Sequence, residues 1–255
     1  MDEPLPEKRR DLPLIHLLPN LLTLTAICAG LTAIRFGFHG DFERAVRLIL
    51  LAGILDGVDG RLARLLRCQS LFGAELDSLA DFLNFGVAPG LILYAWALNE
   101  MPSAGWIAVL FYVICCVLRL ARFNVDNTSD TPKPAAEFFV GVPSPAGAIL
   151  AMLPMYVSFL FADRPTAPAG PVAIYIVVIG LLMISRIPTY SFKNLSVARE
   201  KARYLLLGCI LLAAALLTYL WATLLALCLA YVAGTLWVLR RTRRPGQEQE
   251  NQNED

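Results

Sequence analysis

The amino-acid sequence predicts an all-α membrane protein, a polytopic bundle of about eight transmembrane helices with both termini in the cytoplasm. Of its 255 residues, 57% are hydrophobic and 17% are charged, and the mean hydropathy is +0.58. Several apolar runs approach the roughly 20 residues that a helix needs to cross the hydrocarbon core. These runs are continuous rather than alternating, which disfavours a transmembrane β-barrel.

The sequence divides into four expected segments. Residues 1–17 form a cytoplasmic or interfacial start, 18–188 a core of six spans, 189–239 a connector with two additional spans, and 240–255 a disordered cytoplasmic tail. The eight expected spans are about 18–36, 43–67, 71–98, 104–123, 143–162, 170–186, 204–219 and 221–239. The last two adjoin closely, but together they are too long for a single span.

The basic residues predict the orientation. With the N-terminus inside, 18 of the 22 Lys and Arg residues fall on the cytoplasmic side, as the positive-inside rule requires. We therefore expect a multi-pass protein of the cell (inner) membrane, surrounded by membrane lipids and without a nucleic-acid partner. The charged start predicts no cleavable signal peptide. The six cysteines lie in or beside apolar runs without metal-ligand spacing, which favours buried hydrophobic roles.

Four aspartates interrupt this apolar pattern. Asp56 and Asp59 lie three residues apart near the end of the second span, and Asp77 and Asp81 lie four apart in the third. On helices, these spacings place each pair on one face. Ionised side chains in a membrane helix are costly unless they are hydrated, paired or liganded. All-oxygen ligands suit Mg²⁺ or Mn²⁺, with Ca²⁺ as a further occupant, so the sequence predicts a divalent-metal site, with room for two ions.

Two simpler interpretations remain beside this one. The aspartates could pair with Arg61, Arg64 and Arg67 in the following loop. The nearby small residues could either clear space for a ligand or only let helices pack closely, because GILDG and GVAPG both have the GxxxG form. A cation transporter is a third alternative. It is disfavoured because the acids cluster toward one side and the outer halves of the spans are apolar.

The pattern D-x2-D-G-x2-A-R-x8-G-x3-D-x3-D accounts for the whole stretch. Its eight fixed positions are Asp56, Asp59, Gly60, Ala63, Arg64, Gly73, Asp77 and Asp81. This pattern resembles the hallmark of the CDP-alcohol phosphotransferases, which are integral membrane enzymes. Further segments, including LPNLLTLTAICAG, RLARFNV and FVGVPSPAGA, are similar to the branch that transfers phosphatidyl from CDP-diacylglycerol to L-serine in phospholipid biosynthesis.

The resemblance implies a role for each motif residue. Asp56, Asp59 and Asp77 would bind one metal ion, and Asp56, Asp77 and Asp81 a second. Asp81 would also be the catalytic base that deprotonates the acceptor hydroxyl. The residues implied to hold CDP-diacylglycerol are Asn20, Asp56, Asp59, Gly60, Ala63, Arg64 and Gly73. The resemblance also implies a homodimer.

The acceptor depends on residues outside the motif. Arg119 and Arg122 are candidates to bind the serine carboxylate, because guanidinium groups pair well with carboxylates. Arg186 and Lys193 are further candidates, for serine or for lipid phosphate. Ordinary positive-inside topology would explain the same residues. A related enzyme acting on glycerol 3-phosphate, an inositol phosphate or choline therefore remains an alternative.

Overall fold

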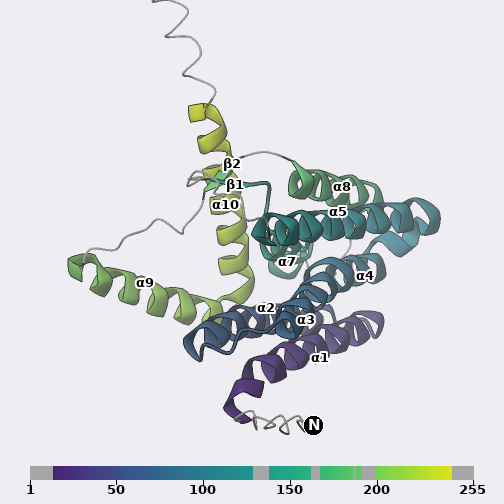
Figure 1. The fold of residues 1–255 in the computed structure, drawn as a ribbon. Helices are drawn as coiled ribbons and strands as arrows, with labels where there is room; N and C mark the ends of the chain where they lie inside the picture. The colour runs from purple at the N-terminus through teal and green to yellow at the C-terminus, as the bar shows by residue number, and fades with distance from the viewer. Residues whose placement is uncertain (1–13, 129–137, 162–166, 186–187, 191–198, 243–255) are drawn as a thin grey trace, which may run out of the picture.

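The computed structural model describes residues 14–128, 138–161, 167–185, 188–190 and 199–242 (Figure 1). The helices are η1 (Leu14–Leu17), α1 (Leu18–Phe38), α2 (Phe42–Leu65), α3 (Leu71–Asp81), the π-helical η2 (Phe82–Val87), α4 (Ala88–Trp96), η3 (Leu98–Glu100), α5 (Pro102–Thr128), α6 (Ser144–Ala151), α7 (Leu153–Phe161), α8 (Ala169–Ile184), α9 (Arg199–Thr218) and α10 (Leu220–Thr242). Two short strands, β1 (Phe138–Val140) and β2 (Pro188–Tyr190), pair antiparallel.

The predicted helical architecture is confirmed, and each expected span corresponds to a helix or to consecutive helices. Within the described residues, five helical segments are long and apolar enough to cross a membrane. Two more apolar helices, Ala169–Ile184 and Leu206–Thr218, are shorter, and α2 carries charged residues toward both ends. The count of eight spans and the cytoplasmic termini therefore stay predictions. The strands were not predicted, because β1 and β2 fall in segments expected to be connectors.

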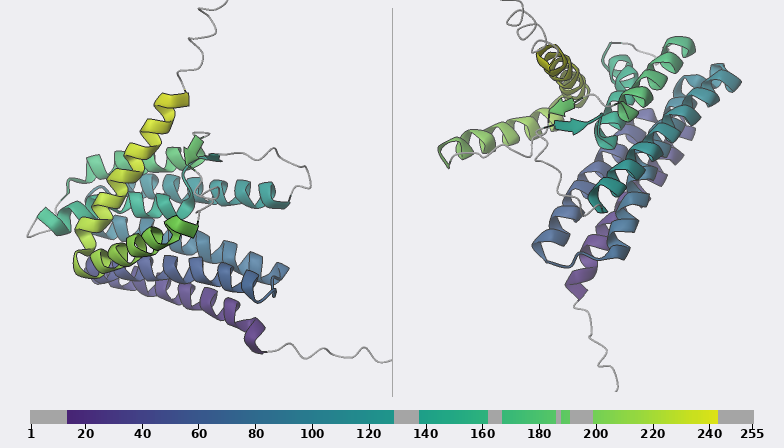
Figure 2. Two further views of the ribbon diagram at one scale, coloured as in Figure 1. Left: turned by 90° about the vertical axis from the view of Figure 1, so that its left-hand side faces the viewer. Right: turned by 45° about the horizontal axis from the view of Figure 1, so that its top comes forward.

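Helices α1 to α8 form the bundle, whereas α9 and α10 diverge from it. In the views of Figures 1 and 2, α10 runs at a steep angle to α1 and α5, and it packs against α7. Helices α1 and α2 approach closely through alanines such as Ala26, Ala33 and Ala52, all fully buried. Small residues permit this close packing. The pairing of α1 with α2 places the start of α1 beside the end of α2.

Two prolines interrupt the helices, and a tyrosine compensates for each. Pro89 has no N–H to donate to the carbonyl of Phe85, four residues earlier, and Pro154 likewise cannot donate to Leu150. The Tyr112 hydroxyl donates to the Phe85 oxygen at 2.7 Å, and the Tyr175 hydroxyl donates to the Leu150 oxygen at 2.8 Å. The first of these bonds supports η2, which follows Asp81 directly.

Replacing Tyr112 with phenylalanine should destabilise the protein by about 1–3 kcal/mol, because a buried carbonyl loses its donor. Tyr156→Phe is the matched control: Tyr156 is also fully buried, but its hydroxyl has no hydrogen-bond partner in the described part of the chain, so its removal should be neutral or stabilising. Thermal unfolding in detergent micelles measures both. Equal destabilisation by the two substitutions would contradict the role assigned to the Tyr112 hydroxyl.

Candidate active site

A polar pocket lies at the end of the bundle where α1 begins, α2 ends and α3 begins. It has a volume of about 300 Å³. Its lining includes Asn20, Thr23, Asp59, Gly60, Ala63, Ser70, Gly73 and Asp77. The pocket therefore brings together, from three helices, five of the residues predicted to hold CDP-diacylglycerol. These are Asn20, Asp59, Gly60, Ala63 and Gly73. The pocket lies at the same end of the bundle as Arg61 and Arg67, both exposed.

The pocket depends on glycines that leave space. A Cβ atom added at Gly60 or Gly57 would meet nothing within 4 Å, whereas one at Gly73 would lie 3.1 Å from Oδ1 of Asn20. The glycines of GVAPG differ, because a Cβ at Gly86 or Gly90 would press against α5 side chains. The small residues therefore differ in use: Gly57 and Gly60 adjoin open space, whereas Gly73, like the glycines of GVAPG, lies against side chains of a neighbouring helix.

Asp59 is the most deeply buried of the four aspartates, with 2% of its surface exposed. The Thr23 hydroxyl donates to Oδ2 of Asp59 at 2.5 Å and also lies 3.1 Å from the carbonyl oxygen of Pro19. Sequence reasoning missed Thr23. Its position three residues after Asn20, on the same face of α1, was the available signal.

The other three aspartates lie near enough to Asp59 to interact with it electrostatically. Asp56 and Asp81 are within hydrogen-bonding reach of each other, and Asp77 lies near Asp56 and Asp59. One carboxylate oxygen on each of Asp56, Asp59 and Asp81 is buried and has no hydrogen-bond partner among the residues that the structure describes. Within the described chain, these aspartates form no ion pair with Arg61, Arg64 or Arg67; instead Nε of Arg64 donates to the Gly60 carbonyl at 3.1 Å. The salt-bridge interpretation is therefore not supported.

The fit to a metal ion is partial in this conformation. Unpartnered, buried carboxylate oxygens are the donors that hard cations prefer. However, among the described residues no three or more His, Cys, Asp or Glu side chains are grouped as a ready-made metal site. That the four aspartates bind metal ions therefore stays a prediction.

Two of the arginines predicted to bind the acceptor, Arg119 and Arg122, lie toward the C-terminal end of α5. Nε of the buried Arg119 donates to the Val142 carbonyl at 3.4 Å. Nη1 of Arg122 donates to the Ile184 carbonyl, at the end of α8, at 3.0 Å. Neither arginine lines the pocket. The other two candidates, Arg186 and Lys193, lie outside the described residues.

One residue of the same segment joins α5 to the aspartate helix. Nδ2 of Asn124 donates to the Ser78 hydroxyl at 3.0 Å, and Ser78 directly follows Asp77. Sequence reasoning did not single out Asn124, although it belongs to the RLARFNV segment. The contact brings the end of α5 that carries Arg119 and Arg122 alongside α3.

Comparison with known proteins identifies the family. The CDP-alcohol phosphatidyltransferase model matches residues 16–236, so the chain belongs to this family. Three similar relatives are named CDP-diacylglycerol–serine O-phosphatidyltransferase. The protein from Mycobacterium tuberculosis is 39% identical over 96% of this chain and 85% of its own length. The one from Mycobacterium leprae is 39% identical over 93% and 79%, and the one from Helicobacter pylori 38% over 71% and 74%.

Proposed function

We propose that this enzyme transfers the phosphatidyl group from CDP-diacylglycerol to L-serine, giving phosphatidylserine and CMP. We further propose that it acts in the cell membrane as a homodimer, with its site open to the cytoplasm. The observation that carries the proposal is the pocket that joins Asn20, Gly60 and Gly73 to Asp59 and Asp77. The names of the relatives support the two substrates.

The proposed reaction is a single in-line displacement. The serine hydroxyl oxygen attacks the diacylglycerol-side phosphorus, and the phosphorus–oxygen bond to CMP breaks, so that CMP leaves with the bonding electrons. Asp81 takes the proton of the attacking hydroxyl, because an alcohol is a weak nucleophile without a positioned base. Its place beside Asp56 on rigid helices supports this role, since the base needs no loop closure to reach the reaction centre.

Divalent cations, Mg²⁺ or Mn²⁺, are the proposed cofactors, with Asp56, Asp59 and Asp77 holding one ion and Asp56, Asp77 and Asp81 the other. When bound, they would neutralise the charge on the pyrophosphate and on the departing CMP. The unpartnered oxygens of Asp56, Asp59 and Asp81 support the proposal.

The serine carboxylate is proposed to bind near Arg119 and Arg122, with Arg186 and Lys193 as further candidates. Each of the two α5 arginines donates to a backbone carbonyl, and because a guanidinium group has five N–H donors, one such bond does not use up its capacity to bind a carboxylate. The Asn124–Ser78 contact supports the assignment because it holds this end of α5 beside the aspartate helix.

An acceptor panel tests the proposed function. Purified enzyme would receive CDP-diacylglycerol and Mn²⁺ or Mg²⁺ with serine, glycerol 3-phosphate, an inositol phosphate or choline in separate reactions, and CMP release would be followed. We expect release with serine. Release with another acceptor and none with serine would overturn the choice of serine while retaining the reaction class.

Gly60→Val tests the nucleotide pocket. The new side chain would occupy part of the 300 Å³ pocket, and its Cβ would meet nothing within 4 Å, so it should weaken CDP binding by about tenfold to a hundredfold, or roughly 1.4–2.8 kcal/mol. Gly208→Val on α9 is the control, because its Cβ also meets nothing within 4 Å. Titration calorimetry with CDP measures the difference. Unchanged affinity in Gly60→Val would exclude this pocket as the nucleotide site.

A further inference from the structure

A second and larger cavity lies along α2 on the N-terminal side of Asp56, whereas the polar pocket is lined by α2 residues that follow Asp56. Its volume is about 850 Å³, within the usual range for ligand sites of about 300–1,000 Å³. Helix α2 forms one wall, through residues such as Leu50 and Gly53. Helices α6 and α7 and the corner between α9 and α10 form the others, with Ile149, Ala222 and Leu224 among the lining residues. Nearly all of the lining is apolar, so it suits a hydrocarbon rather than a polar substrate.

The cavity begins next to the reaction centre. Gly53 and Ile54 line it and lie within one turn of Asp56 on α2. Phe85 also lines it, about one turn beyond Asp81. A phosphate held among the aspartates would therefore have an apolar channel directly beside it.

The cavity and the aspartates beside it together span about the thickness of one membrane leaflet. Along α2 it extends to Arg47, nine residues from Asp56, which at 1.5 Å per residue is about 14 Å. Half of a hydrocarbon core of about 30 Å is about 15 Å. An acyl chain attached at the aspartates and pointing away from the polar pocket would fill this distance.

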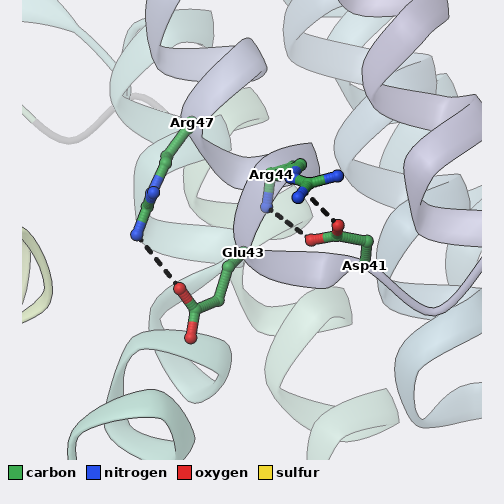
Figure 3. A network of polar contacts seen from close by, with 4 residues as sticks. All are labelled: Asp41, Glu43, Arg44 and Arg47. Carbon is green, nitrogen blue, oxygen red and sulfur yellow. Dashed lines mark hydrogen bonds and ion pairs between the residues drawn. The ribbon is translucent and has the colours of Figure 1, made fainter.

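The far end of the cavity is polar and aromatic. Nη2 of Arg47 lies 3.0 Å from Oε2 of Glu43 (Figure 3), and its guanidinium carbon lies 5.6 Å from the ring centroid of Trp221. Trp221 in turn contacts Phe159, with ring centroids 4.7 Å apart. A hydrocarbon chain gains no free energy by extending from apolar surroundings to an ion pair, so these residues mark the end of the apolar cavity.

We propose that this cavity holds one acyl chain of the nucleotide-activated diacylglycerol, with the chain end near Arg47 and Trp221. The α9–α10 corner then has a specific role, because it supplies the wall that encloses the chain and favours long-chain substrates. The proposal rests on the proposed function for the identity of the lipid. It assigns the channel to the substrate rather than to bulk membrane lipid.

Ala222→Phe tests the wall. The exposed Ala222 lines the cavity, so a phenylalanine there should shorten the channel. We expect kcat/KM for dioleoyl CDP-diacylglycerol to fall about tenfold, as if roughly two methylene groups could no longer be buried, and kcat/KM for the dioctanoyl substrate to stay unchanged. Ala233→Phe is the matched control, three turns further along α10, exposed and outside the cavity. Equal losses for both chain lengths, or no loss for either, would overturn the proposal.

A second measurement does not depend on turnover or on the acceptor. CDP-diacylglycerol with a photoactivatable group at the end of one acyl chain would be cross-linked to the wild-type enzyme without serine, and the site would be mapped by mass spectrometry. We expect labels at Trp221 or Leu224, abolished by excess unlabelled CDP-diacylglycerol but not by phosphatidylcholine. Labels confined to the exposed face of α5, such as Ile107, or equal competition by phosphatidylcholine, would overturn the proposal. Persistent specific labelling without serine-dependent CMP release would support the acyl site and reject serine as the acceptor.

Discussion

Replacing Asp81 with asparagine is expected to lower kcat by about 10²–10⁴-fold, the usual contribution of a positioned general base. Asparagine keeps the shape of the side chain but cannot accept the serine proton at neutral pH. Asp81 is half-buried beside Asp56, so the amide should be accommodated without rearranging α3. CMP release at saturating serine and CDP-diacylglycerol measures the effect.

The matched control is Glu75→Gln, which removes an exposed carboxylate from the same helix. Its turnover should equal that of the wild type. CDP binding distinguishes a lost base from a damaged site, because Asp81→Asn should keep its affinity for CDP within a few-fold. Turnover of Asp81→Asn close to that of the wild type would reject Asp81 as the base.

Replacing Asp56 with asparagine should reduce turnover by about 10³-fold or more. Asp56 belongs to both proposed cation sets, and a metal ion supplies several kcal/mol of charge stabilisation in the transition state, at about 1.4 kcal/mol for each factor of ten. No single substitution of Asp59 or Asp81 would remove a ligand from both sets. Serine-dependent CMP release again measures the loss.

Thermal unfolding tests metal binding by Asp56 independently of enzyme activity. In a chelator, Asp56→Asn should be as stable as the wild type or more so, because it removes one of two close carboxylates that repel each other. Mn²⁺ should raise the unfolding temperature of the wild type through preferential binding to the folded state, but not that of the variant. Glu100→Gln, at an exposed acid in η3, should respond to Mn²⁺ like the wild type. Equal Mn²⁺ stabilisation in Asp56→Asn would contradict the metal site.

The residues near the pocket divide into those that local spacing could predict and those that it could not. The pairs Asp56/Asp59 and Asp77/Asp81 follow from helical spacing, because residues three or four apart share a face. Thr23 and Asn124 were missed because their partners, Asp59 and Ser78, lie 36 and 46 residues away in the sequence. Spacing along one helix shows which residues share a face, as Thr23 does with Asn20, but not which distant residue that face contacts.

The sequence by itself determined the helical architecture with its apolar segments and the family to which the chain belongs. Long apolar runs can satisfy their backbone polar groups in lipid only as helices or closed barrels, and the eight fixed residues from Asp56 to Asp81 define the family pattern. Tertiary structure alone decided how Tyr112 supports the π-helical turn after Asp81, and which glycines clear space rather than pack. It also decided that the α9–α10 corner meets α2 at an apolar cavity. These features depend on contacts between distant segments, and only the packing of the helices brings those segments together.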